Sequence, residues 1–175
     1  MKYNSKAFLF FNIISFYIYW WASFLGVSYG YYYYGPIFTL IYLVLHFILI
    51  KNKLKEFKFI MFCTILGFII ETSFLKLDII EYRGILTDRF DIAPLWIILL
   101  WSGLASTFFH SFKWILGNYK LGIPLGAIFT PLAYLYGVKF DIISFSYPLV
   151  ESYLILSIVW GFAFFLLIYI ADFFN

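Results

Sequence analysis

Apolar residues run along this chain in six long stretches, separated by short links that carry most of the charge. Each stretch is longer than a strand, and its few polar residues recur three or four positions apart, the spacing of one helix face. We therefore predict an all-α fold, a single integral membrane domain spanning 1–175 with six transmembrane helices. The expected helices cover residues 7–27, 36–50, 59–75, 94–114, 121–136 and 149–170. The first stretch resembles a signal peptide, but it is too long and lacks a small-residue cleavage site, so we expect it to be retained.

The stretch over 94–114 has the most polar of the expected interior faces. Pro94 suits a first helical turn, because its missing N–H would have no partner there. About 19 residues at about 1.5 Å each reach about 28 Å, enough to cross a hydrocarbon core. Trp96, Thr107, His110 and Trp114 fall on one stripe of this helix. We expect the helix to lie inside the bundle.

Composition supports a membrane location and argues against several functional classes. Hydrophobic residues make up 65% of the chain, and the mean hydropathy of +0.94 is far above that of soluble domains. The net charge of +3 is small and lies mostly at helix ends, so we expect no nucleic-acid partner. The single Cys63 can form no internal disulfide. The sequence carries no H-E-x-x-H, P-loop or dinucleotide-binding pattern, and we expect no cofactor.

The distribution of lysine and arginine orients the predicted helices. With the N-terminus in the cytoplasm, eight of the 12 Lys and Arg residues fall on the cytoplasmic side. These eight are Lys2, Lys6, Lys51, Lys53, Lys55, Lys58, Lys113 and Lys120, and the outer four are Lys76, Arg83, Arg89 and Lys139. By the positive-inside rule we expect a multi-pass protein of a bacterial inner membrane, with both termini in the cytoplasm.

Topology also gives each polar residue a depth. His46 and His110 lie about four residues before the cytoplasmic ends of their helices, roughly 6 Å into the membrane, and Asn12 lies at a similar level. We predict that these three residues form one polar cluster with Ser111. Glu71 lies near the outer end of its helix, so we predict that it does not pair with His110.

Glu71 is the most costly residue to bury. We expect it to pair with Arg83, Arg89 or a hydroxyl group, or to reach the outer interface and fix the long loop over 76–93. The apolar residues of that loop, Leu77, Ile79, Ile80, Ile85 and Leu86, predict that it folds back on the bundle.

Two residues are candidates for catalysis. His110 would act as a general acid or base, and Ser111 or Asn12 would orient the substrate. The alternatives are a packing role for His110 and an interfacial position for His46. Two histidines with no nearby carboxylate or thiol make a poor metal site, so none is expected. The candidate ligand-binding residues are Asn12, His46, Glu71, Trp96, Trp101, Thr107, Thr130 and Tyr134.

The fourth and fifth stretches carry motifs that resemble those of a known family. The fourth begins Pro94-Leu-Trp96 and ends His110-Ser-x-x-Trp114, and the fifth carries Pro124, Gly126, Pro131, Tyr134 and Gly137. This pattern resembles a family of small bacterial inner-membrane proteins classed as a domain of unknown function, over nearly the whole chain. The resemblance implies an acidic residue late in the third helix, which Glu71 matches where Asp is more usual. It implies no activity.

The polar faces are expected to converge on a small aromatic-lined cavity inside the bundle. We predict that the cavity binds or modifies a lipid-like hydrophobic ligand drawn from the surrounding membrane lipids. One alternative is a small proton-linked transporter, in which Glu71 and the histidines are protonation sites. The other is a non-catalytic subunit, in which the small residues Ser102 and Ser106 face a partner membrane protein or a second copy. Whether the protein is an enzyme stays open.

Overall fold

The computed structural model describes residues 6–85 and 91–174 and consists almost entirely of helices. The helices are α1 (Lys6–Ser28), α2 (Tyr34–Leu49), α3 (Lys53–Lys76), α4 (Leu95–Ala105), α5 (Tyr119–Lys139) and α6 (Leu149–Phe174). A 3₁₀ turn, η1 (Lys113–Ile115), and two short strands, β1 (Ile80–Tyr82) and β2 (Ile143–Phe145), complete the described elements. The predictions that involve Lys2, Leu86 and Arg89 lie outside the described residues.

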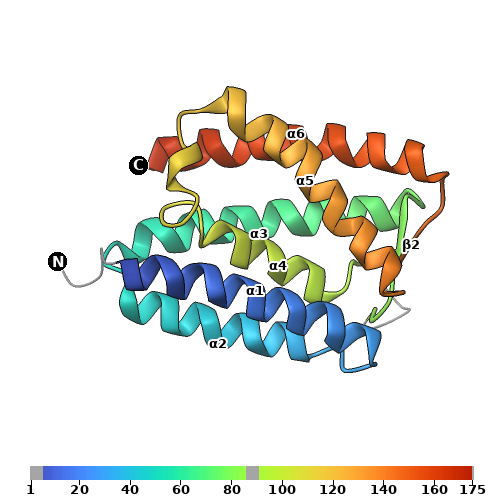
Figure 1. Ribbon diagram of the computed structural model, residues 1–175, viewed down its shortest axis with the longest axis horizontal. Helices are drawn as coiled ribbons and strands as arrows, with labels where there is room; N and C mark the ends of the chain where they lie inside the picture. The colour runs from blue at the N-terminus through green and yellow to red at the C-terminus, as the bar shows by residue number, and fades with distance from the viewer. Residues whose placement is uncertain (1–5, 86–90, 175) are drawn as a thin grey trace.

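The helices form three antiparallel pairs stacked side by side (Figure 1). α1 packs on α2, α3 on α4 and α5 on α6, and the α3–α4 pair lies between the other two. α1 begins and α6 ends at the same end of the bundle, which is also the end where the chain turns from α2 into α3 (Figure 1). The basic residues 51–58 therefore lie at the same end as both termini.

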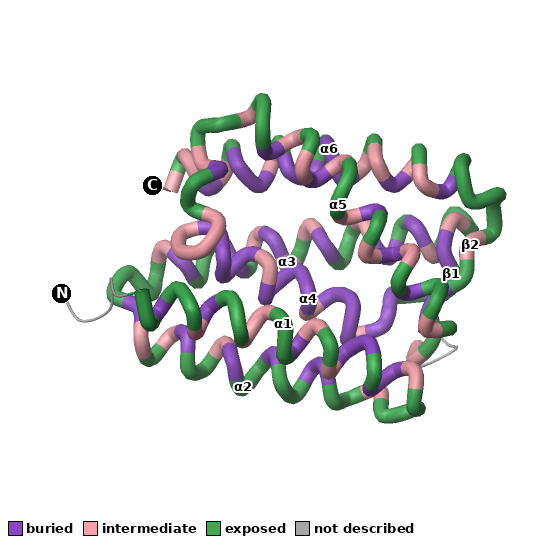
Figure 2. Tube along the Cα trace, in the orientation of Figure 1, coloured by how far each residue is buried: buried purple, intermediate pink, exposed green. Residues whose placement is uncertain are grey.

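Four of the helices, α1, α3, α5 and α6, are long and apolar enough to cross a membrane. They contain 23, 24, 21 and 26 residues, whereas α2 has 16 and α4 has 11. The outward faces of α1, α2, α5 and α6 expose large apolar side chains (Figure 2). Such faces suit contact with lipid chains. α4, by contrast, is mostly buried, with eight of its 11 residues inside the bundle, as predicted for this stretch.

The predicted helix over 94–114 is wrong in its second half, because α4 ends at Ala105. Ser106 and Thr107 each donate a hydroxyl hydrogen bond to a carbonyl three residues earlier, at 2.6 Å. These hydroxyl groups compete with backbone N–H groups for the carbonyls of the last helical turn. The backbone then continues as tight turns, in which the Thr107 N–H donates to the Leu104 carbonyl. At about 1.5 Å per residue, α4 is only about 16 Å long. Trp114, expected on the interior stripe, is instead 57% exposed.

Irregular backbone at membrane depth is stable only where protein covers it. Protein covers the first part of this segment, since Ser106, Thr107 and Phe108 are buried, whereas residues 109–112 are half-buried and Lys113 and Trp114 are exposed. The small residues Ser102 and Ser106 make contacts within this chain. The Ser102 hydroxyl lies 2.8 Å from the Thr64 hydroxyl of α3, and the Ser106 hydroxyl lies 2.7 Å from the Tyr42 hydroxyl of α2.

The connection after α3 folds back on the bundle, as predicted. Its strand β1 pairs with β2 in an antiparallel ribbon, in which Ile80 faces Phe145 and Tyr82 faces Ile143. Ile80 and Tyr82 are buried, whereas Leu77 is exposed. This ribbon was not predicted, and it brings Tyr82 to the end of α3 where Glu71 lies.

Candidate functional site

Two separate polar groups lie along α3. Glu56 is in its first turn and Glu71 is near its last turn. They are 15 positions apart, which corresponds to about 22 Å of helix. Each carboxylate has its own set of partners, so Glu71 and His110 belong to different groups, as predicted. We describe the two groups as the Glu71 centre and the Glu56 centre.

The Glu71 centre is a buried carboxylate that accepts three hydrogen bonds. Its Oε1 accepts from Trp101 Nε1 at 2.8 Å and from the Tyr134 hydroxyl at 2.5 Å. Its Oε2 accepts from the Tyr82 hydroxyl at 2.6 Å. Tyr82 lies outside the membrane-spanning helices, and burial raises the pKa of its phenol, which therefore stays protonated and can donate.

A second layer of contacts fixes the orientation of these donors. Trp160 Nε1 donates to the Tyr134 hydroxyl at 3.3 Å, so this hydroxyl accepts from α6 while it donates to α3. The rings of Trp101 and Trp160 stack with centroids 4.3 Å apart. Gly67 lies one turn before Glu71, and a Cβ there would overlap the Trp101 ring. Of the partners expected for Glu71, hydroxyl groups are the ones found, whereas Arg83 contacts Asp141 at 3.2 Å and Arg89 lies outside the described residues.

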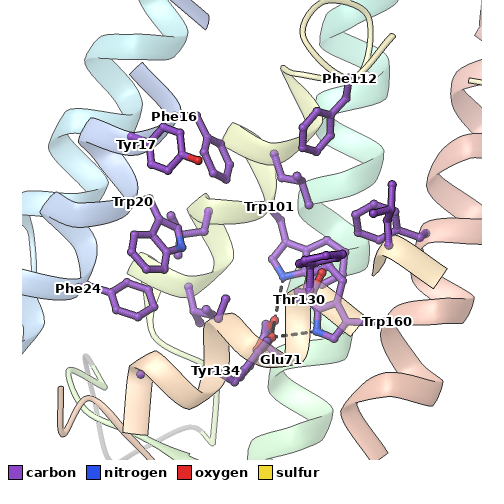
Figure 3. Close-up of a pocket in the computed structure, with 18 of the residues that line it drawn as sticks. Phe16, Tyr17, Trp20, Phe24, Glu71, Trp101, Phe112, Thr130, Tyr134 and Trp160 are labelled. Carbon is purple, nitrogen blue, oxygen red and sulfur yellow. Dashed lines mark hydrogen bonds between the residues drawn. The ribbon is translucent and has the colours of Figure 1, made fainter. Parts of the chain in front are cut away.

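The Glu71 centre forms part of the wall of a cavity of about 450 Å³. The cavity lies between α1 on one side and α5 and α6 on the other, with α4 between them (Figure 3). Its lining is mostly aromatic, and among the described lining residues Glu71 carries the one charged side chain. The labelled lining residues in Figure 3 are Phe16, Tyr17, Trp20, Phe24, Glu71, Trp101, Phe112, Thr130, Tyr134 and Trp160.

The cavity opens sideways. Tyr17, Trp114 and Phe129 all line it and are each more than half exposed. Tyr17 and Phe129 lie at the midpoints of α1 and α5, two of the helices able to cross a membrane. Two of these exposed lining residues therefore lie midway along the bundle and not at either end of it.

The Glu56 centre contains the polar cluster predicted near the other end of the bundle. Asn12 Nδ2 donates to the Tyr42 hydroxyl at 2.7 Å, and Asn12 Oδ1 accepts from the Ser111 hydroxyl at 2.5 Å. The Tyr42 hydroxyl also lies 3.4 Å from His46 Nδ1. Asn12, His46 and Ser111 thus meet as predicted, although the hydroxyl of Tyr42 joins two of them.

His110 joins this cluster through Glu56. His46 Nε2 lies 2.8 Å and His110 Nε2 2.9 Å from the same oxygen, Glu56 Oε2. His46 is fully buried, and the side chain of Glu56 is 7% exposed. The premise that no carboxylate lies near the histidines is therefore wrong.

The candidate ligand-binding residues divide between the two centres. Glu71, Trp96, Trp101, Thr130 and Tyr134 line the cavity. Asn12 and His46 belong to the Glu56 centre, and Thr107 donates its hydroxyl bond to the Leu104 carbonyl. The structure thus places seven of these eight residues in two groups about 22 Å apart along α3, and not around a single cavity.

Sequence analysis missed Glu56 because it lies within a run of lysines that resembles a solvated turn. α3 begins at Lys53, one and a half turns earlier than predicted, and Glu56 then falls on its buried face. The buried positions of that face, Glu56, Ile60, Cys63, Gly67 and Glu71, are spaced three or four apart. Extending the interior stripe of α3 backwards from Glu71 would have found Glu56. Tyr82 and Trp160 had no such signal.

These features define an all-helical chain with helices able to cross a membrane and an aromatic cavity between them. Residues 9–166 match the profile of the family described as Protein of unknown function (DUF2878). The chain belongs to this family, which agrees with the resemblance seen in the fourth and fifth stretches. No curated protein and no solved structure matches the chain.

Proposed function

We propose that this is a multi-pass membrane protein that binds a hydrophobic, lipid-like molecule in the cavity beside Glu71. The observation that carries the proposal is an aromatic cavity of about 450 Å³ whose opening lies at the midpoint of two long apolar helices. This volume is in the range of cavities that hold small organic ligands. A molecule entering there comes from the lipid phase and stays out of water.

The chemistry of Glu71 restricts the ligand further. Oε1 already accepts two hydrogen bonds, whereas Oε2 accepts one, from Tyr82. A carboxylate oxygen can accept two bonds. Oε2 can therefore accept one more hydrogen bond, which favours a ligand that carries a hydroxyl or amine donor on an apolar body. The stacked rings of Trp101 and Trp160 offer a flat surface for that body.

The proposal covers binding and not chemical modification of the ligand. His110 and Ser111, the candidate catalytic pair, belong to the Glu56 centre and are not among the described residues that line the cavity. Among the described residues, the three donors to Glu71 are tyrosine and tryptophan side chains and none is a histidine. A ligand bound beside Glu71 would therefore lie roughly 20 Å from His110.

The proposed topology has six crossings with both termini in the cytoplasm of a bacterial inner membrane. α2 and the segment 94–118 would complete the crossings that the four long helices begin. The arrangement of both termini and the basic residues 51–58 at one end of the bundle supports this orientation (Figure 1).

A second candidate function, proton-linked transport, is favoured by one contact. The hydroxyls of Thr64 and Ser102 lie 2.8 Å apart, between the Glu56 centre and the Glu71 centre along α3 and α4. With water, this pair would form one step of a polar path between the two carboxylates. Proton flux into proteoliposomes that falls in Ser102→Ala would support this function, and flux equal to that of protein-free liposomes would exclude it.

Ligand binding is tested by native mass spectrometry and extraction of bound lipids. The variants are Ala133→Phe, which fills the cavity from α5, and Leu132→Phe, which adds the same ring on the exposed side of the same helix. We expect wild type and Leu132→Phe to retain one defined hydrophobic compound and folded Ala133→Phe to lose it. Bulk phospholipid alone in wild type, or equal retention in both variants, would overturn the proposal.

A further inference from the structure

The Glu56 centre brings together three side chains of the kinds that bind transition metals. His46 comes from α2, Glu56 from α3 and His110 from the turns after α4. One ligand atom from each lies within 4.8 Å of the other two. The chain contains two histidines, and both are in this group. We propose that His46, Glu56 and His110 bind one divalent transition-metal ion, of the zinc or iron class.

The hydrogen bonds around His46 determine which of its nitrogens carries a proton. The Ser106 hydroxyl donates to the Gly103 carbonyl at 2.6 Å, so Ser106 Oγ accepts from the Tyr42 hydroxyl at 2.7 Å. Tyr42 has no second proton to donate. Its 3.4 Å contact with His46 Nδ1 therefore requires Nδ1 to carry the hydrogen and the Tyr42 oxygen to accept it.

With the proton on Nδ1, neutral His46 directs the lone pair of Nε2 at Glu56. That nitrogen lies 2.8 Å from the carboxylate oxygen, and two acceptors at this distance repel. A positive charge between them removes the repulsion. It can be a proton on His46 or a metal ion that both atoms bind. His110 Nε2 converges on the same oxygen from a third element, which a metal ion explains for all three groups together.

The surroundings match those of a bound metal. Metal-binding histidines usually donate their second ring N–H to a neighbouring acceptor, which fixes the ring, and Tyr42 fills this role for His46. Asn12 Nδ2 in turn donates to Tyr42 at 2.7 Å and fixes the acceptor. Two imidazoles and one carboxylate suit zinc or ferrous iron and leave a coordination position open.

The geometry requires a small movement for metal entry. Ligand atoms around a tetrahedral zinc are about 3.4 Å apart, given bond lengths of about 2.1 Å. The present nitrogen-to-oxygen distances are 2.8 and 2.9 Å. Moving the Glu56 carboxylate back by roughly half an ångström would open the position. In this arrangement His110 is a ligand instead of the acid or base expected from the sequence.

The test measures metal content and affinity in detergent-purified protein that carries no histidine tag. Wild type is analysed by elemental mass spectrometry, stripped with EDTA and titrated with Zn²⁺ and with Co²⁺, whose visible spectrum reports its ligands. We expect about one ion per chain, and a loss of at least about tenfold in affinity in His46→Ala, His110→Ala and Glu56→Gln. Tyr42→Phe keeps all three ligands and should weaken binding by about tenfold.

Glu151→Gln is the matched control, because Glu151 is an exposed carboxylate in the first turn of α6. It should bind metal as wild type does, and circular dichroism verifies that each variant is folded. Wild type that takes up no stoichiometric metal would overturn the proposal and leave the Glu56 centre as a charge pair. Unchanged affinity in folded Glu56→Gln and His110→Ala would also overturn it, since the metal would then bind elsewhere.

Discussion

Replacement of Glu71 separates the role of an acceptor from that of a negative charge. In Glu71→Ala, three buried donors lose their acceptor: Tyr82, Trp101 and Tyr134. An unpaired buried donor costs about 1–3 kcal/mol. At the lower end of this range, about 1 kcal/mol for each donor, the three donors together cost about 3 kcal/mol.

In Glu71→Gln, the amide oxygen can take the place of Oε1 and keep two of the three bonds. The amide N–H then faces Tyr82, whose hydroxyl can rotate to accept from it. The expected cost is about 1 kcal/mol. For a chain of this size, 1 kcal/mol shifts the Tm by about 2–4 °C. We therefore expect Tm to fall by about 2–4 °C in Glu71→Gln and by about 6–12 °C in Glu71→Ala.

The assay is thermal unfolding in one detergent, followed by circular dichroism, with Glu151→Gln as the control for loss of an exposed charge. A Tm in Glu71→Gln as low as in Glu71→Ala would refute the reasoning, because it would make the charge and not the acceptor the stabilising feature. Unchanged Tm in both variants would show that the three hydrogen bonds contribute nothing measurable.

Three further predictions concern packing, the Glu56 centre and topology. Gly67→Ala forces the Trp101 ring away from Glu71 and should lower the free energy of unfolding by about 1–3 kcal/mol, seen as a lower Tm and a shifted tryptophan emission. A variant with the Tm and emission of wild type would contradict the close packing. Asn12→Leu removes three hydrogen bonds and takes the partner from the Ser106 carbonyl and the Ser111 hydroxyl, which should cost about 2 kcal/mol, whereas a change below about 0.5 kcal/mol would mean that this cluster is hydrated. Asn52→Cys in a Cys63→Ser background should react with a membrane-impermeant maleimide in inverted vesicles and not in spheroplasts, and the reverse result would invert the topology.

Most of the helical framework was predictable from sequence, because each helix has an apolar face repeated over several turns. α1, α2, α3, α5 and α6 each lie where an apolar stretch predicted a helix. The exception is 94–114, where the length of the apolar stretch predicted one long helix. Hydroxyl bonds from Ser106 and Thr107 to the preceding turn end it at Ala105, and the surrounding helices bury the first part of the irregular backbone that follows. The hydropathy of a stretch does not indicate where side-chain hydroxyls compete with backbone N–H groups for helix carbonyls.

The sequence by itself determined which residues face the interior and roughly how deep each lies, since helical spacing and rise per residue are constant. It therefore placed Asn12, His46 and Ser111 together and kept Glu71 apart from His110. Only the tertiary structure decided which atoms meet. The ribbon of β1 and β2 brings Tyr82 to Glu71, and the earlier start of α3 puts Glu56 between two histidines. These contacts join elements far apart in the chain, and no pattern within one helix specifies its partner across the bundle.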